Sequence, residues 1–213
     1  DFNNMLSPII SYTQMLKMDI PEESELNLYA DGIYTAALRS KELVHQILTF
    51  SRQAEQKLAP IKLAPVIKEA LNLIKSSVPP NIKIVERIDK NAGFVVADIT
   101  QIHQIIMNLA TNACHAMEEN GGILTVELKE VVRDTVPEDF ICLKVSDTGI
   151  GIDQSIIDKV FDPYFTTKTG DKGTGLGLSV VQGIVNSYDG DIIINSSPGI
   201  GTEVVIYLPI HHS

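Results

Sequence analysis

Two asparagines stand four positions apart in the segment NLATNA, which begins at Asn108 and includes Asn112. Residues four apart project from the same face of a helix, and this helix is otherwise apolar. Amide oxygens are ligands that Mg²⁺ accepts together with waters and substrate phosphates, so the pair predicts a cation site. The alternative is a solvated polar stripe, because asparagine is common on protein surfaces.

A carboxylate, Asp147, follows the apolar run 141–145 and opens the segment DTGIGI. A carboxylate at the end of a strand can accept hydrogen bonds from an exocyclic amine. Gly149 and Gly151 would let a flat ligand approach the backbone. Taken alone, Asp-x-Gly after a strand is more typical of a simple turn.

A glycine-rich segment, GTGLGLS, begins at Gly173 and leads into a helical pattern over 180–188. Amides at a helix N-terminus favour phosphate, so the segment predicts a phosphate-binding loop. It is not a dinucleotide fingerprint, because a loop precedes it, and it lacks the ending of a Walker A loop. The aromatic segment FDPYFTTK comes before it, and the turn GIGTE places Thr202 before the last strand.

The elements that must position these clusters alternate along the second part of the chain. Helical spacing is found at 66–74, 102–117 and 180–188, and strand patterns are found at 82–88, 124–128, 141–145, 192–194 and 204–208. Only turn-rich residues separate the last two strands. This order predicts an α/β sandwich with a mixed, mostly antiparallel sheet and one helix layer, which makes the whole chain α+β.

The first part has two helical apolar stripes separated by a break at 19–23. The stripes are Phe2, Leu6, Ile9 and Leu16, then Leu26, Ala30, Ile33, Ala37, Val44 and Ile47. They predict an antiparallel helical hairpin, and a second copy would bury the remaining apolar surface as a four-helix bundle. We therefore expect a homodimer, with the hairpin in residues 1–56, a linker near 53–60 and the sandwich in residues 57–213.

Composition excludes several classes of protein. The 213 residues are 44% hydrophobic and 21% charged, which suits a folded core, and the net charge of −10 argues against nucleic acid as a partner. No apolar run approaches the ~20 residues of a membrane span, so no direct membrane contact is expected. Two cysteines cannot form a disulfide framework, which fits a reducing compartment.

In this order, the clusters closely resemble the N, G1, F, G2 and G3 boxes of the histidine protein kinase catalytic domain. That domain is a member of the gyrase, Hsp90, histidine kinase and MutL superfamily, and the resemblance covers about residues 60–210. The opening DFNN resembles the phosphoacceptor helix of the hybrid-type group, in which a His immediately precedes this sequence. That His would stand one position before Asp1 and is not among these residues.

The resemblance implies roles for individual residues. Asp147 would bind the adenine amine, Thr202 would support the adenine side, and Asn112 with Asn108 would ligate Mg²⁺. Asp1 would take a proton from the acceptor imidazole, and Asn4 would orient a phospho-His or an attacking water. The implied nucleotide-binding residues are Asn108, Asn112, His115, Asp147, Gly149, Gly151, Ile152, Phe165, Lys168, Lys172, Gly173, Thr174, Gly175, Leu176, Gly177, Leu178 and Thr202.

The function implied is that of a two-component histidine kinase core, which uses ATP and Mg²⁺ and acts on a response regulator receiver domain. A bacterial cytoplasmic location follows from the family, even for a membrane-anchored parent protein. One alternative is a nucleotide-binding scaffold or a phosphatase-biased pseudokinase. Another is a gyrase- or chaperone-type ATPase, but Asn108 stands where those enzymes have the Glu that activates water.

Overall fold

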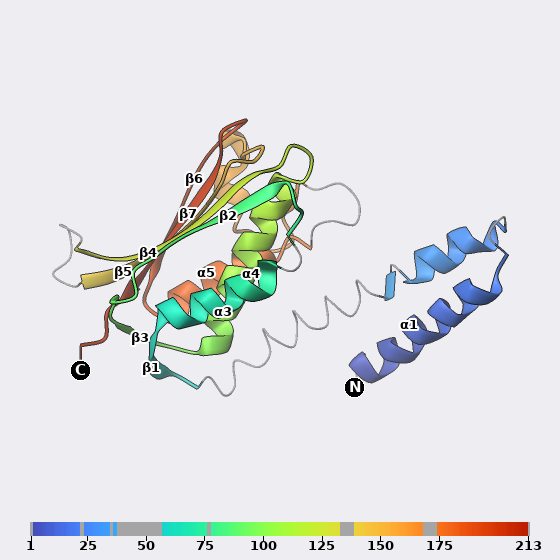
Figure 1. Cartoon of the computed structure of the whole chain (residues 1–213), viewed down its shortest axis with the longest axis horizontal. Coiled ribbons are helices and arrows are strands. Elements are labelled where there is room, and N and C mark those ends of the chain that lie inside the picture. Colours follow the sequence, from blue (N-terminus) through green and yellow to red (C-terminus); the bar gives the residue numbers. More distant parts are fainter. Residues whose placement is uncertain are drawn as a thin grey trace. The chain divides into compact units, whose positions relative to one another are not determined.

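The computed structural model describes residues 2–21, 24–34, 36–37, 57–75, 78–132, 139–167 and 174–212. The chain divides into two compact units, Asp1–Gln56 and Lys57–Ser213 (Figure 1).

The first unit contains a helical hairpin. Helix α1 spans Phe2–Asp19, and residues 26–34 and 36–37 are also helical. Lys17 Nζ lies 2.5 Å from Asp31 Oδ1, and Gln14 donates to the Tyr34 hydroxyl at 2.9 Å. Gln14 comes before Lys17 in the chain, whereas its partner Tyr34 comes after Asp31. The two helices therefore run antiparallel, as predicted.

Much of the apolar surface of the hairpin stays exposed in a single chain. Ala30 is buried, but Ile9, Leu16 and Ile33 are 44%, 48% and 49% exposed. All four belong to the two stripes seen in the sequence. These exposed positions belong to the stripes that, in our prediction, a second copy would bury.

The second unit is built on a five-stranded sheet in the order β2-β4-β5-β7-β6. Its strands are β2 (Ile82–Ile88), β4 (Gly122–Val132), β5 (Asp139–Asp147), β6 (Asp191–Ser197) and β7 (Gly201–Pro209). β2 runs parallel to β4, and the other three pairings are antiparallel. The predicted mixed, mostly antiparallel sheet is confirmed.

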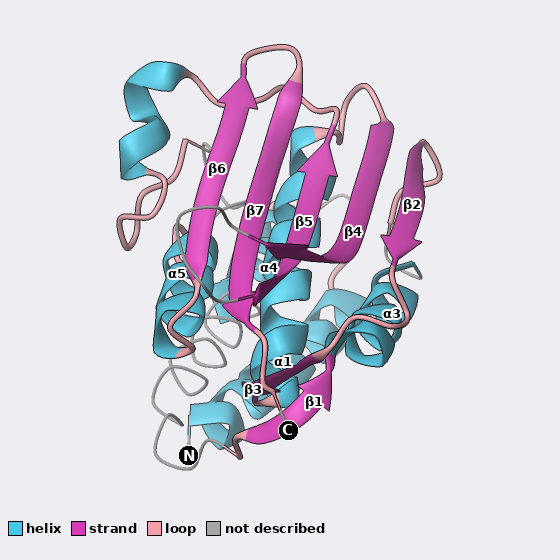
Figure 2. Ribbon diagram, turned by 90° about the vertical axis from the view of Figure 1, so that its left-hand side faces the viewer, coloured by secondary structure: helices cyan, strands magenta, loops and turns pink. Residues whose placement is uncertain are grey.

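Three helices form one layer on one face of this sheet (Figure 2). They are α3 (Leu63–Lys75), α4 (Ile99–Ala116) and α5 (Gly177–Ser187). Their apolar sides and the inner face of the sheet form one core. It includes Ile67, Leu71, Ile102, Ile105, Ile106, Leu124, Leu128, Ile141, Leu143, Val181, Val185 and Ile206. The predicted single helix layer is confirmed.

A second, two-stranded sheet was not predicted. Its strands β1 (Ala59–Lys62) and β3 (Phe94–Ala97) pair antiparallel, so the predicted linker end at residue 60 is wrong and β1 begins inside it. Pro60 and the short length of both strands conceal them in the sequence, because proline is typical of linkers and strand edges. A short 3-10 helix, η2 (Gln154–Lys159), was also missed.

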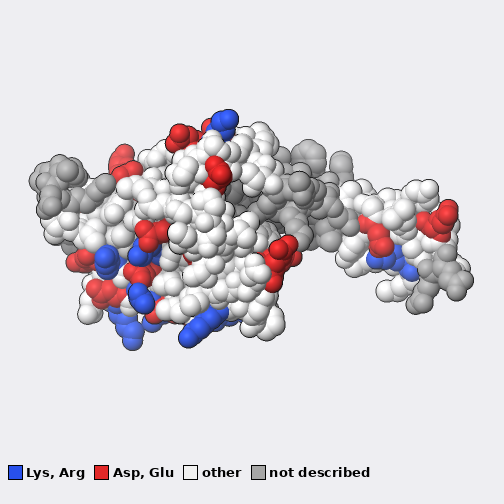
Figure 3. All heavy atoms as spheres, turned by 90° about the horizontal axis from the view of Figure 1, so that it is seen from above, with Lys and Arg blue, Asp and Glu red and all other residues white. Residues whose placement is uncertain are grey.

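Acidic and basic side chains are interspersed on the face of the protein shown in Figure 3. No helix among the described residues combines the length and apolar character that crossing a bilayer needs.

Candidate functional site

The two asparagines of α4 meet the start of α5. Asn108 Nδ2 donates to the Gly177 carbonyl at 3.3 Å. A Cβ placed on Gly177 would lie 3.5 Å from Asn112 Nδ2. Both asparagine side chains are half-buried, and they project from one face of α4 as their spacing predicted. One polar face of α4 therefore lies against the first residue of α5.

The first turn of α5 carries no side-chain cap, since Leu176 at the N-cap makes no capping hydrogen bond through its side chain. Thr174 Oγ1 instead accepts from the Leu176 amide at 3.4 Å. Leu178 packs its partly buried side chain against the core. The helix thus starts beside the side chains of Asn108 and Asn112. The backbone N–H groups of its first turn have no side-chain cap from Leu176, and such N–H groups attract anions.

Asp147, the last residue of β5, holds the loop that follows it. Its Oδ1 accepts from the Gly149 amide at 2.8 Å and from the Thr202 amide at 3.3 Å. Burial raises the pKa of this carboxyl, and the two hydrogen bonds offset part of that rise. Among the described residues both hydrogen bonds reach Oδ1, so Oδ2 is the oxygen left to accept from a ligand.

The loop after β5 approaches other backbone so closely that it needs glycine. A Cβ on Gly149 would lie 2.6 Å from the Ala116 carbonyl oxygen. Gly151 has φ 71°, and its Cβ would lie 2.0 Å from the Ser197 carbonyl oxygen. The Ile150 amide also donates to Ala116 O at 3.1 Å. The end of α4 and the turn between β6 and β7 therefore enclose this loop.

Ser196 was not predicted as a site residue, yet it joins the loop after β5 to β7. Its buried hydroxyl accepts from the Ile152 amide at 2.8 Å and lies 2.9 Å from Thr202 Oγ1. In the sequence it stands in NSSPG, which is typical of a turn. Its position directly opposite Thr202 in the β6–β7 register could be found only once that register was known.

The aromatic segment is fixed to the glycine-rich segment at one point. The Tyr164 amide donates to the Gly175 carbonyl at 2.9 Å. Both residues have left-handed backbone, with φ 69° and 67°, and a Cβ on Gly175 would lie 2.4 Å from the Tyr164 carbonyl carbon. Phe165 is half-buried beside this contact in the chain. His115 is half-buried in the last turn of α4.

The second unit therefore brings together most of the predicted residues, in two groups held by α4. One group surrounds Asp147 and the other surrounds the start of α5. Asp1, Lys168, Lys172 and Gly173 lie outside the described residues. Asn4 lies in α1 of the first unit, and its side chain is also outside the description.

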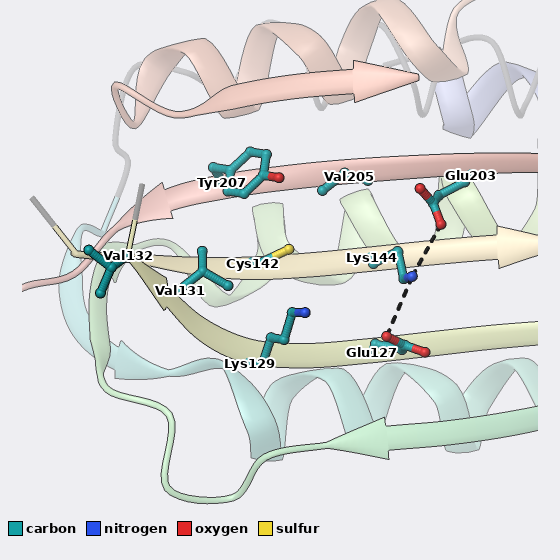
Figure 4. Close-up of a pocket in the computed structure, with 9 residues that line it drawn as sticks. All are labelled: Glu127, Lys129, Val131, Val132, Cys142, Lys144, Glu203, Val205 and Tyr207. Carbon is teal, nitrogen blue, oxygen red and sulfur yellow. Dashed lines mark ion pairs between the residues drawn. The ribbon is translucent and has the colours of Figure 1, made fainter. Parts of the chain in front are cut away.

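A separate hollow of about 280 Å³ lies on the other face of the sheet (Figure 4). Lys144 on β5 bridges two carboxylates there, at 3.1 Å from Glu203 Oε2 and 3.6 Å from Glu127 Oε2. The hydrogen bond with Glu203 raises the pKa of Lys144, although burial acts against it. None of the predicted site residues lines this hollow, so it is distinct from the candidate site.

Comparison with known proteins identifies the family of this chain. Residues 97–212 match the family described as "Histidine kinase-, DNA gyrase B-, and HSP90-like ATPase". The sensor kinase CckA of Brucella abortus is 34% identical over 218 residues, which cover 98% of this chain and 23% of CckA.

Two solved structures share the fold along nearly the whole chain. Full-length ShkA in complex with AMPPNP has a TM-score of 0.73 at 22% identity, covering 100% of this chain and 44% of ShkA. Histidine kinase ThkA in complex with the response regulator TrrA has a TM-score of 0.69 at 24% identity, covering 99% and 59%. The chain thus spans only part of each of these relatives. It belongs to the histidine kinase-, DNA gyrase B- and HSP90-like ATPase family, and it carries the ATPase domain of a sensor histidine kinase.

Proposed function

We propose that this chain is the kinase core of a two-component system. It binds Mg-ATP between α4, the loop after β5 and the start of α5. It passes the γ-phosphoryl group to a His immediately upstream of Asp1 and then to an Asp of a response regulator. The structure of ShkA, which is a complex with AMPPNP, supports the choice of nucleotide.

The observation that carries this proposal is that one helix holds both ends of the site. The Ala116 carbonyl of α4 binds the Asp147 loop, and Asn108 binds the start of α5. The two residues are eight positions apart, which corresponds to about 12 Å along a helix. An elongated ligand with an amine at one end and phosphates at the other matches this arrangement.

The donors at the phosphate end fit a hard cation. Asn112 and Asn108 would hold Mg²⁺ through amide oxygens, and the ion would neutralise charge on the phosphates. The other contacts with the phosphates would come from Lys168, Lys172 and the backbone of 173–178. At the other end, Asp147 would accept from the adenine amine while Gly149, Gly151, Ile152 and Thr202 surround the ring.

Asn108 cannot act as a general base, because its amide has no basic site at neutral pH, and it already donates to Gly177. This favours a site that retains ATP until a nucleophile arrives from the hairpin. Asp1 would accept the imidazole proton, and Asn4, about one helical turn from the acceptor, would orient the phospho-His or a water.

The proposed partners are a second copy of the chain, through the hairpin, and a receiver domain. The exposed stripes of the hairpin support the first. The structure of ThkA, which is a complex with a response regulator, supports the second.

A labelling experiment tests the transfer. The chain, extended by the native residues upstream of Asp1, is incubated with γ-labelled ATP and Mg²⁺. We expect an acid-labile, alkali-stable label that disappears when the residue before Asp1 is replaced and that moves to a receiver domain. ATP binding without label would favour the scaffold or the phosphatase-biased protein, and steady hydrolysis without an acceptor would favour the ATPase.

A further inference from the structure

Ser196 is a buried polar side chain at the proposed adenine end, with an exposed fraction of 8%. Its Oγ lies 2.8 Å from the Ile152 amide, 2.9 Å from the Gly201 carbonyl and 2.9 Å from Thr202 Oγ1. The three partners come from the loop after β5 and from the first two residues of β7. One hydroxyl therefore connects both walls of this end of the site.

The chemistry of these partners fixes where the protons lie. A serine hydroxyl has one hydrogen and two lone pairs. Ile152 N–H can only donate to it, and the Gly201 carbonyl can only accept from it. The single Ser196 proton is then used, so the contact with Thr202 forms only if the Thr202 hydroxyl donates. This arrangement satisfies every group of a buried hydroxyl, which burial strongly favours.

When the Thr202 hydroxyl donates its one hydrogen to Ser196, it has none left for a ligand and can only accept a hydrogen bond from it. The Thr202 amide meanwhile donates to Asp147 Oδ1 at 3.3 Å, so Thr202 and Asp147 are adjacent. Two groups that accept hydrogen bonds therefore stand at the same end of the site. They match a 6-amino purine, which donates there, and they oppose a 6-oxo purine, whose carbonyl can only accept.

We infer that Ser196 is a positioning residue that makes the Thr202 hydroxyl an acceptor and thereby sets a preference for 6-amino over 6-oxo purine nucleotides. This inference rests on the proposed nucleotide binding. Gln154 also donates to the Ser196 carbonyl at 2.5 Å, which holds the strand end and the loop in register.

The test measures dissociation constants of the chain for ATP and for inosine triphosphate by calorimetry with Mg²⁺. We expect Ser196→Ala to lower the preference for ATP about fivefold, the worth of one hydrogen bond. The matched control is Ser197→Ala, which removes an exposed hydroxyl one position away and should leave the preference unchanged. Thr202→Val should also lower the preference, and adding Ser196→Ala to it should cause no further fall.

An equal weakening of both nucleotides by Ser196→Ala would overturn the inference, because a merely structural serine would affect both alike. Thermal unfolding of each variant checks that it folds. Where Ser196→Ala does not fold, Ser196→Cys keeps the shape with weak hydrogen bonding and must lower the preference in the same direction. A wild-type chain that binds neither nucleotide would instead overturn the proposed function.

Discussion

The ionised carboxylate of Asp147 lowers the stability of the nucleotide-free protein, because burial disfavours the charged form and raises the pKa. An asparagine has the same shape and keeps an oxygen for the Gly149 and Thr202 amides, but it carries no charge. Asp147→Asn should therefore weaken ATP binding about 10- to 100-fold without lowering the thermal midpoint of the nucleotide-free chain. Calorimetry and thermal unfolding measure both effects. Asp158→Asn, which alters an exposed carboxylate, should change neither.

The same carboxyl predicts opposite effects of pH on stability and binding. Since the pKa of Asp147 is higher in the folded chain, its contribution to stability is fully present below the unfolded pKa and is lost as pH rises through the folded pKa. ATP affinity should rise over that same range, because the ionised form accepts from the amine. The free energy of unfolding and the ATP affinity are measured against pH for the wild type and for Asp147→Asn. The two proteins should differ only by the titration of this carboxyl. Identical pH profiles would contradict it.

Sequence reasoning found the side chains whose chemistry is visible locally. The spacing of Asn108 and Asn112 fixes a shared helix face, and the structure places that face against Gly177. Ser196 could not be found this way. Its partners are at positions 152, 201 and 202, and only the strand register and the loop geometry bring them to one hydroxyl.

At the scale of elements, α4 is the helix on which the site depends, and Asp98 begins it. Asp98 Oδ1 accepts from the Thr100 and Gln101 amides, and Oδ2 accepts from Lys57 N at 3.1 Å. Burial acts to raise the pKa of Asp98, but these hydrogen bonds outweigh it and lower the pKa. The cap therefore fastens the first residue of the second unit to its central helix.

Asp98→Ala should lower the free energy of unfolding by about 1–2 kcal/mol, the usual worth of an N-cap. Urea unfolding of the second unit measures this. The control is Glu119→Ala, just beyond the other end of α4, where loss of a negative charge should be neutral or slightly stabilising. Equal effects of the two substitutions would contradict the capping role.

Two glycines of α5 separate binding from helix stability. Gly177→Ala adds a methyl group 3.5 Å from Asn112 Nδ2, at the proposed phosphate end, whereas Gly183 has nothing within 4 Å of its Cβ position. Gly183→Ala should stabilise the fold by about 0.5–1 kcal/mol and leave ATP affinity unchanged. Gly177→Ala should lower the affinity without destabilising the helix. Calorimetry and urea unfolding distinguish these outcomes.

The longer helices and strands could be predicted from the periodic spacing of apolar residues in the sequence. The predicted run 141–145 lies within β5, which extends two residues further at each end. The predicted helix 102–117 corresponds to α4, which begins three residues earlier and ends one residue earlier. β1 and β3 were missed because four-residue strands are too short to show alternation. Their pairing depends on contacts between distant segments, which local patterns do not contain.

At the scale of the whole molecule, we expect the second unit to bind ATP and the first unit to form the dimer. Residues 57–213 should bind ATP like the full chain but remain monomeric, while the full chain should dimerise through the hairpin. Sedimentation at several concentrations tests this. Leu16→Glu, in the exposed stripe, should weaken the dimer, and Met18→Glu, at an already 85% exposed position, is its control. A dimer formed by residues 57–213 would contradict this division.

The face of the sheet opposite α3, α4 and α5 has a further consequence for the proposed dimer, in which the hairpin would hold two copies of the second unit close together. Tethering raises their local concentration, which favours stacking of open sheets. The Glu127–Lys144–Glu203 bridge crosses three neighbouring strands on that face. Stacking would remove water from three charges, and charged groups are costly to desolvate even when they are paired. In the proposed dimer, the bridge would therefore oppose association of the two sheets through this face.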